Sequence, residues 1–328
     1  MLQVTSPQGR TLHFQQTGAM LQGLLAVVLF SLTVPMTKIA MEVFSAEFIA
    51  ACRGFIAGAL CLLVVVYNDW SFPKFKECLW LLLSGLGVVV AFPYLLSLTL
   101  ESVSAANMGI ILAGLPLATS LMAVVLLGER YRAGFWICAL LGAGVLMLYF
   151  SQSQAAVLPK GEGELGRLFL LAITTLLLGG MGYAAGTRAA KTLGGWPTIC
   201  WMLVLFLPFS ALAFGFFGYE QLGLSGVAHT QEAINSAAIK PQVSASAYDL
   251  KAWLSIFYLA LISQWWGFRF LYSAMAEAGA GTIGQIQLLQ PFFTLGFSAW
   301  LLMEPLQISQ FAFLGVIICL VAGAIKFK

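Results

Sequence analysis

The chain has very few charged residues and almost no histidine. Of its 328 residues, 9% are Asp, Glu, Lys or Arg and 2 are histidines, whereas 60% are hydrophobic. So few charges cannot cover the surface of a soluble protein of this size, which excludes a soluble fold and indicates an integral membrane protein. The small formal net charge of +3 gives no indication of a nucleic-acid partner.

Motifs for catalysis and for cofactors are missing as well. The sequence contains no phosphate-binding loop, no zinc-binding histidine pair and no serine nucleophile elbow. Residues 161–166 formally match a dinucleotide fingerprint, but no strand precedes them and their acidic side chains would repel a pyrophosphate. The six cysteines are scattered singly, unlike a metal site or a disulfide framework. We therefore expect no enzyme activity, no cofactor and no metal.

The chain is instead rich in apolar stretches. A stretch of about 20 apolar residues crosses the hydrocarbon of a bilayer as a helix. The sequence therefore predicts an all-α integral membrane fold with ten transmembrane helices, near residues 19–38, 45–67, 78–98, 104–127, 133–150, 167–189, 196–217, 251–275, 280–303 and 307–326.

One half of the chain repeats the other. Pro116 and Glu129 lie thirteen residues apart, and Pro291 and Glu304 repeat that spacing with both positions shifted by 175. Five predicted helices separate matching positions, so the second copy runs through the membrane in the opposite direction, as in transporters with inverted repeats. We expect a five-helix repeat over residues 1–150, a linker over 151–166 and a second five-helix repeat over 167–328.

Basic residues in the loops predict the orientation. Loops on the cytoplasmic side of a membrane carry the excess of Lys and Arg. If the N-terminus is cytoplasmic, most of the Lys and Arg residues in the loops lie on the cytoplasmic side, and the C-terminus is cytoplasmic as well. The inner set is Arg10, Lys74, Lys76, Arg130, Arg132, Arg188, Lys191, Lys326 and Lys328, and the outer set is Lys38, Lys160, Arg167, Lys240 and Lys251.

Polar side chains inside predicted helices are candidates for function. Arg53 lies well inside the second helix, where it either holds an anionic substrate group or pairs with Glu47 or nearby carbonyls. Arg269 either contacts substrate or extends to the cytoplasmic interface, and Lys38 is expected to anchor the end of the first helix.

Amides and aromatic rings complete the set of candidates. Gln285, Gln287 and Gln290 cluster before Pro291, where they either bond neighbouring helices or contact substrate. Any single aromatic residue of the set also fits ordinary packing. The predicted substrate-binding residues are Tyr94, Asn107, Tyr183, Trp265, Arg269, Gln287 and Gln290.

Prolines and two glutamates mark predicted structural or gating positions. Pro116 and Pro291 remove backbone hydrogen bonds and are expected to kink their helices toward a cavity. Glu129 and Glu304 stand where one helix ends and the next begins, so we expect them to stabilise helix N-termini. Lys38 and Arg53 belong to the same predicted set.

These residues resemble the ten-helix, EamA-type members of the drug/metabolite transporter superfamily. The resemblance spans nearly the whole chain and rests on the segment from Pro116 to Glu129, its copy from Gln287 to Glu304, Lys38 and Arg53. It implies a bacterial inner-membrane exporter that works by alternating access. It also implies a central cavity lined by the first, third, fourth, sixth, eighth and ninth helices. Met303 departs from the glycine usual at its position.

The predicted function is therefore transport of a small molecule, by a monomer or homodimer in the lipid bilayer. Aromatic walls, amides and an arginine favour amino acids or related zwitterions over a bare cation. Buried acids for proton relay are missing, since Glu47, Glu101 and Glu277 fall at helix ends, which favours facilitated export. The alternatives are proton-coupled efflux of toxic compounds and a non-transport membrane sensor or partner that reuses the fold.

Overall fold

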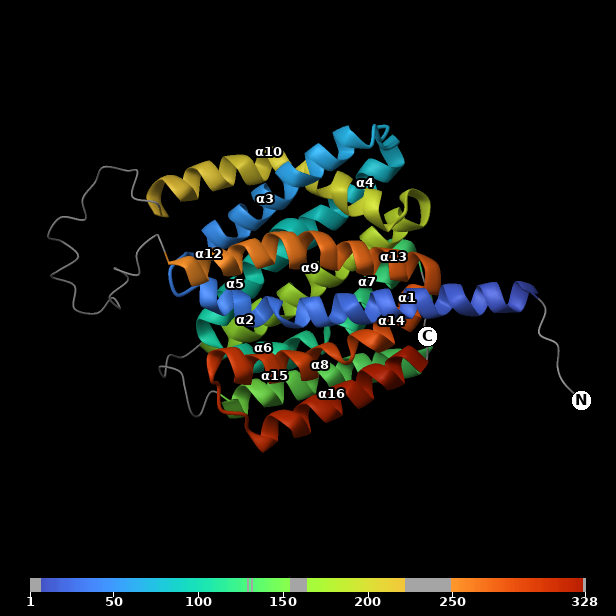
Figure 1. The fold of residues 1–328 in the computed structure, drawn as a ribbon. Coiled ribbons are helices and arrows are strands. Elements are labelled where there is room, and N and C mark those ends of the chain that lie inside the picture. The colour runs from blue at the N-terminus through green and yellow to red at the C-terminus, as the bar shows by residue number, and fades with distance from the viewer. Residues whose placement is uncertain (1–6, 129, 131, 154–163, 222–248, 327–328) are drawn as a thin grey trace, which may run out of the picture.

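The computed structural model describes residues 7–128, 130, 132–153, 164–221 and 249–326. Regular structure within these ranges is helical throughout, without a strand, so the prediction of an all-α fold is confirmed. The helices lie side by side in one bundle, and α1 begins at the same end of the bundle at which α16 finishes (Figure 1).

Interrupted helices are a main feature of the bundle. Several predicted helices are built from two or three consecutive elements, and two of these elements, η1 and η2, are π-helical. In chain order the elements are α1 (Pro7–Ser31), α2 (Thr33–Ala40), α3 (Ala46–Tyr67), α4 (Phe75–Gly85), η1 (Leu86–Ala91), α5 (Phe92–Ser102), α6 (Ala105–Leu112), α7 (Leu115–Leu127), α8 (Ala133–Ser153), α9 (Glu164–Leu193), α10 (Gly195–Gln221), α12 (Leu250–Phe257), η2 (Tyr258–Gly267), α13 (Phe268–Ala278), α14 (Ala280–Gln287), α15 (Gln290–Leu302) and α16 (Ile308–Lys326).

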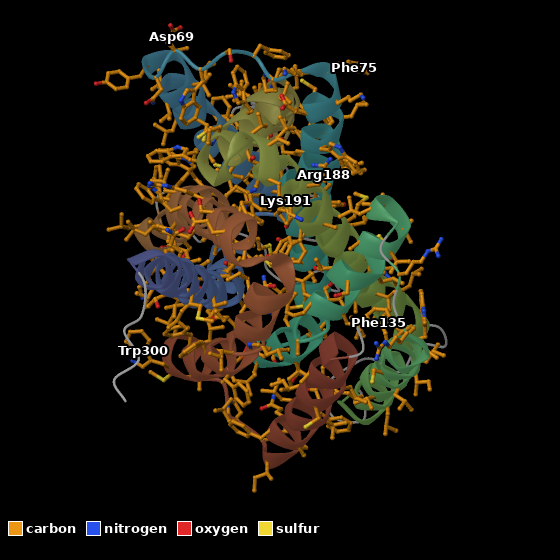
Figure 2. All side chains as sticks on the ribbon, turned by 90° about the vertical axis from the view of Figure 1, so that its right-hand side faces the viewer. Asp69, Phe75, Phe135, Arg188, Lys191 and Trp300 are labelled. Atoms are coloured by element: carbon orange, nitrogen blue, oxygen red, sulfur yellow. The ribbon has the colours of Figure 1, made fainter. Side chains whose placement is uncertain are left out.

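The surface of the bundle is apolar. Leu63, Leu212 and Trp300 are 65%, 77% and 69% exposed, and Trp300 stands at the periphery in Figure 2. Such a surface suits lipid rather than water. Six helical runs among the described residues are long and apolar enough to cross a membrane: Thr17–Ala40, Ala46–Tyr67, Phe75–Ser102, Ala105–Leu127, Gly166–Leu193 and Gly195–Tyr219. Two shorter apolar helices, Ala133–Gly142 and Ile308–Leu320, accompany them.

Element boundaries recur at the 175-residue offset that the sequence shows. Both α7 and α15 are 13 residues long, and each is followed by a left-handed residue, Gly128 (φ 68°) and Met303 (φ 53°). Left-handed backbone favours glycine, so Met303 adopts a conformation that is unusual for its type. The pairs of first residues at this offset are Phe75 and Leu250, Ala105 and Ala280, Leu115 and Gln290, and Ala133 and Ile308.

Prolines explain two of the interruptions. Pro116 and Pro291 stand in the first turn of α7 and α15, and both are buried. Proline lacks a backbone N–H and clashes with the preceding turn, so it fits the start of a helix and separates it from the one before. The sequence predicts kinks at these positions, and the structure has full breaks, with α6 ending at Leu112 and α14 at Gln287.

The π-helical segment η1 packs against α9 and is hydrogen-bonded to the other π-helical segment, η2. A Cβ atom on Gly87 of η1 would lie 2.5 Å from the carbonyl oxygen of Leu178, so only glycine permits this approach to α9. Gln264 of η2 is fully buried, and its Nε2 donates a 3.1 Å hydrogen bond to the carbonyl oxygen of Val88 in η1. This hydrogen bond therefore joins the two π segments directly.

Candidate functional site

Arg53 of α3 is a cation buried in the centre of the bundle. Its side chain is 2% exposed, and Nη2 donates a long 3.4 Å hydrogen bond to Oγ of Ser263 in η2. The Ser263 hydroxyl lies 2.8 Å from Oγ1 of Thr33, the first residue of α2. Nε of Arg53 has no hydrogen-bond partner. Within the described ranges no carboxylate forms an ion pair with Arg53, so its charge is left without a counter-charge.

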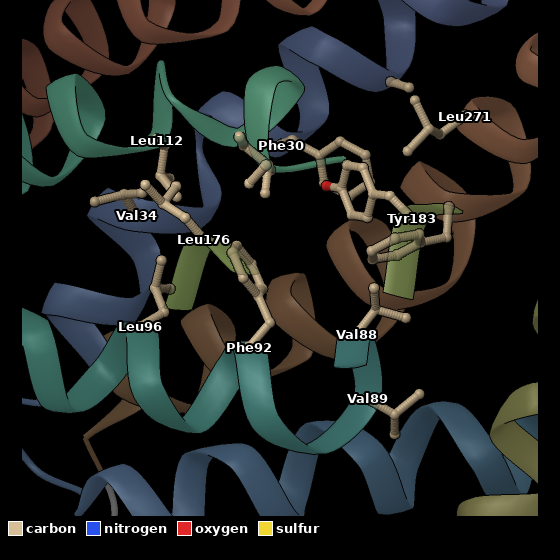
Figure 3. Packing of buried hydrophobic residues seen from close by; sticks show 14 of the residues in the cluster. Phe30, Val34, Val88, Val89, Phe92, Leu96, Leu112, Leu176, Tyr183 and Leu271 are labelled. Carbon is tan, nitrogen blue, oxygen red and sulfur yellow. The ribbon is translucent and has the colours of Figure 1, made fainter. Parts of the chain in front are cut away.

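A small cavity surrounds Arg53. Its free volume is about 10 Å³, roughly that of one water molecule. Phe268 packs edge-to-face against both Phe30 and Tyr183, with ring centroids 4.9 and 5.5 Å apart. Figure 3 shows Phe30, Phe92, Leu96, Leu112 and Tyr183 facing one another there. We call this site the Arg53 cavity; it is lined by Phe30, Thr33, Arg53, Phe92, Leu96, Leu112, Tyr183, Ser263, Phe268 and Gln290.

Half of the lining residues stand at the interruptions of the helices. Thr33, Phe92, Phe268 and Gln290 are the first residues of α2, α5, α13 and α15, and Leu112 is the last residue of α6. Breaks in membrane helices expose backbone groups at mid-depth and are typical of binding sites between transporter repeats. The chain thus places one cation, a hydroxyl pair and four aromatic rings at the level of its broken helices.

A polar stripe leads away from the cavity along α15. Gln290, Thr294 and Ser298 follow one another at intervals of four residues and therefore share a face of the helix. All three side chains are buried, and neither Oγ1 of Thr294 nor Oγ of Ser298 has a hydrogen-bond partner. Buried hydroxyls without partners are costly, so a stripe of them next to a cavity is a sign of function. We call these three residues the α15 stripe.

A second cavity lies on another side of α3. It has a volume of about 310 Å³ and is bordered by α3, η1, α5 and α10. The Tyr94 hydroxyl donates a 3.4 Å hydrogen bond to Oε1 of Glu47 at this cavity. Tyr94 therefore does not reach the Arg53 cavity, and Glu47 binds Tyr94 instead of Arg53. The prediction that Tyr94 shares a site with Tyr183 is wrong, and so is the predicted alternative of an Arg53–Glu47 pair.

Asn107 and Glu304 make contacts at the end of the bundle where α6 begins. Oδ1 of Asn107 accepts hydrogen bonds from the Tyr149 hydroxyl at 2.5 Å and from Nε2 of Gln310 at 2.8 Å. Asn107 thus joins α6 to α8 and α16 and does not line the cavity. The Glu304 carboxylate accepts 2.9 and 2.8 Å hydrogen bonds from the N–H groups of Ala105 and Ala106. It stabilises the N-terminus of α6 in the other half of the chain, rather than that of the helix that follows it.

Arg269, Trp265, Gln287 and Lys38 also lie apart from the Arg53 cavity. The Arg269 guanidinium stacks over the ring of Trp196 at 3.4 Å and lies 4.6 Å from that of Trp266, which are cation–π contacts. Trp265 is half-buried and Gln287 is buried, each with an unpartnered nitrogen, and neither lines the cavity. The Lys38 ammonium donates to the carbonyl oxygens of Leu100 and Val103, at the end of α5.

The structure therefore unites only part of the predicted set. Arg53, Tyr183 and Gln290 meet in one cavity, whereas the other five predicted substrate-binding residues do not line it. Glu129 lies outside the described residues, as does the side chain of Gln285. Thr33, Ser263 and Phe268 were missed, because single hydroxyl and aromatic residues in apolar helices carry no spacing signal. The four-residue spacing of the α15 stripe was a signal that could have been found.

Comparisons with known proteins identify a family of transporters. A model of the EamA-like transporter family matches residues 17–151. The "Uncharacterized transporter YdeK" of Bacillus subtilis (strain 168) is 33% identical over 311 residues, covering 95% of this chain and 98% of that protein. One solved crystal structure of a protein matches with a TM-score of 0.57 and covers 95% of this chain and 96% of its own. At 16% identity that likeness concerns the fold alone.

Proposed function

This chain belongs to the EamA-like transporter family, and we propose that it moves a small organic molecule through the Arg53 cavity by alternating access. The family makes the chain a multi-pass membrane transporter. Alternating access requires a central site that opens to one side of the membrane at a time. Two pairs of residues that the repeat makes equivalent, Gly109 with Thr294 and Gly284 with Thr119, differ in how closely their helices approach. This difference is the observation that supports the mechanism best.

The first contact, between α6 and α15, is closed. A Cβ atom on Gly109 of α6 would lie 2.9 Å from Cγ2 of Thr294, so the two helices approach as closely as a glycine allows. The offset of 175 residues makes Gly284 of α14 and Thr119 of α7 the equivalent pair. A Cβ atom on Gly284 would have no atom within 4 Å. One contact of the pair is therefore closed while its equivalent is apart.

We place these two contacts on opposite sides of the Arg53 cavity. The proposal is that residues 1–150 and 167–328 form two inverted five-helix repeats, joined by residues 151–166, with ten transmembrane helices in total. The equal offsets of the helix boundaries support it. Gly109 and Thr294 then close the outer side, and opening the outer side closes Gly284 on Thr119.

The α15 stripe gives the proposed route its polar surface. Thr294 is a member of the stripe and also touches Gly109, so the stripe runs from the cavity into the closed contact. When α6 moves away, the unpartnered hydroxyls of Thr294 and Ser298 become available to a passing molecule. Their lack of partners in the closed contact is consistent with this use.

The direction and driving force are further parts of the proposal. We propose a bacterial inner-membrane exporter with both termini cytoplasmic, supported by the basic residues near one end of the bundle, such as Arg188 and Lys191 in Figure 2. The described lining of the Arg53 cavity contains no carboxylate and no histidine, which supports facilitated transport over proton-coupled efflux. Small metabolites such as amino acids are the proposed substrates.

The test is uptake of labelled neutral amino acids, phenylalanine and threonine first, into proteoliposomes that contain the purified protein. We expect uptake that equilibrates without an imposed proton gradient. Gln290→Ala should slow uptake about tenfold or more, whereas Gln307→Ala, at an exposed glutamine beyond α15, should not. Accumulation only in the presence of the gradient contradicts facilitated transport. Equal rates for both variants contradict the assignment of the Arg53 cavity.

A further inference from the structure

We infer that Arg53 is the anchor for a carboxylate of the transported molecule, so that the site selects small organic acids with an apolar body and rejects bare amines. The inference deepens the proposed function and rests on it in one respect, that the Arg53 cavity is the transport site. It goes further because it assigns the charge of the substrate and the residue that reads that charge.

The electrostatic argument begins with the burial of Arg53. A guanidinium has five N–H donors and keeps its charge in proteins. Among the described residues, only one donor of the Arg53 guanidinium, at Nη2, has a hydrogen-bond partner, and that partner is the neutral hydroxyl of Ser263 at 3.4 Å. Nε is buried without any partner. A buried charge is costly unless an opposite charge and good hydrogen bonds compensate it, and the described chain supplies neither.

The nearest acidic candidate on the same helix serves another site. Glu47 lies six residues before Arg53, which places the two side chains on different sides of α3. It borders the second cavity with Ala50 and Ala51 and accepts the Tyr94 hydroxyl. No described carboxylate supplies the counter-charge of Arg53, so we assign it to a molecule that enters the cavity. A carboxylate matches the guanidinium fork in two parallel hydrogen bonds.

The rest of the lining fits the remainder of such a molecule. Phe30, Phe92, Phe268 and Tyr183 supply apolar faces, and Thr33, Ser263 and Gln290 supply neutral polar groups. A zwitterion is accepted, because its ammonium can lie against an aromatic face or a hydroxyl oxygen. An amine without a carboxylate would meet the positive charge of Arg53 with nothing to offset it. The free volume of about 10 Å³ is too small for such ligands, so binding accompanies opening of the cavity.

Thermal stabilisation of the purified protein tests the inference without transport. The probes share a phenyl ring and differ in charge: 3-phenylpropionate, L-phenylalanine, 2-phenylethylamine and 3-phenylpropan-1-ol. We expect the two carboxylates to raise the midpoint of thermal unfolding and the amine and alcohol to leave it unchanged. Arg53→Gln should weaken carboxylate binding at least tenfold, Arg53→Lys should retain part of it, and Arg188→Gln, at an exposed arginine of α9, should retain all of it.

Several results would overturn the assignment. It is wrong if no carboxylate stabilises the wild type, if the amine stabilises it as well as the carboxylates do, or if Arg53→Gln binds 3-phenylpropionate normally. Should Arg53→Gln fail to fold, the comparison among probes on the wild type and the partial binding by Arg53→Lys still decide the matter. Carboxylates that bind but are not transported would support the role of Arg53 and contradict the proposed transport function. Amines that are transported would support transport and contradict the role of Arg53 as a carboxylate anchor.

Discussion

The carboxylate of Glu304 accepts a 2.9 Å hydrogen bond from the backbone N–H of Ala105, the first residue of α6. The two residues belong to opposite halves of the chain, and the bond lies at the end of the bundle where α6 and α15 are in contact. Acidic groups stabilise helix N-termini because they meet unpaired N–H groups and a partial positive charge. This bond therefore holds the proposed outer closure together.

Glu304→Ala should destabilise the protein and loosen that closure. Loss of an N-terminal cap costs about 0.5–2 kcal/mol, because the N–H groups lose their acceptor. The check is the midpoint of thermal unfolding in detergent. Glu277→Ala is the matched control, since Glu277 is exposed near the end of α13. Equal losses in the two variants would show that Glu304 is an ordinary surface carboxylate.

Gly109→Ala should open the contact between α6 and α15, whereas Gly284→Ala should change neither contact. The added Cβ at 109 meets Thr294 at 2.9 Å, and overpacking of this kind costs about 1–3 kcal/mol. It should therefore favour opening between α6 and α15, whereas Gly284→Ala, with no atom within 4 Å, should leave the state described here intact. The measurement is the rate of thiol labelling of Ser298→Cys, with the six native cysteines replaced.

A penalty of about 1 kcal/mol on the closed contact corresponds to roughly a fivefold faster labelling rate. We expect that increase with Gly109→Ala and none with Gly284→Ala. Faster labelling in both variants would mean that either substitution loosens the bundle in general, and the proposed pairing of the two contacts would be lost.

Thr294→Val should slow transport without a loss of stability. The Thr294 hydroxyl is buried without a partner, and replacement of an unsatisfied polar group by an apolar group of the same shape is nearly neutral or stabilising. Thr99→Val is the control, because the Thr99 hydroxyl already donates to the carbonyl oxygen of Leu95. Uptake and the unfolding midpoint are measured for both. A drop in stability with normal uptake would make Thr294 a packing residue.

Asn107→Ala should reduce stability rather than substrate affinity. Its side chain accepts hydrogen bonds from Tyr149 and Gln310, and removal of one partner of buried hydrogen bonds costs about 1–3 kcal/mol. Titration of 3-phenylpropionate should give the same affinity as in the wild type. A variant that is stable but binds tenfold more weakly would return Asn107 to the binding residues.

The architecture was predictable where the sequence repeats itself. Pro116 and Pro291 predicted kinks at matching places, where the structure has breaks, because proline acts on its own helix and needs no tertiary contact. The family was predictable for the same reason, since the repeated segments carry the resemblance. The closed contact at Gly109 and its open equivalent at Gly284 were not predictable, because the two glycines have equivalent places in the sequence.

The composition of the site was harder to predict. Arg53, Thr33 and Ser263 come from three distant segments, and only packing brings them together. Tyr94 and Trp265 were misplaced for a local reason, since they lie after or within π-helical segments. A π-helical segment contains an inserted residue, which rotates the side chains that follow it about the helix axis. A regular helical period therefore assigns those side chains to the wrong face of the helix.

The most direct test of alternating access through the Arg53 cavity is uptake by protein in which a cross-link holds Gly284 and Thr119 together. Thr119→Cys and Gly284→Cys are combined in a variant without the native cysteines, cross-linked in proteoliposomes with an oxidant and assayed with labelled phenylalanine. The account predicts that the cross-link forms, that uptake then stops, and that reduction restores it. Uptake that continues at the same rate with the cross-link in place would contradict the account.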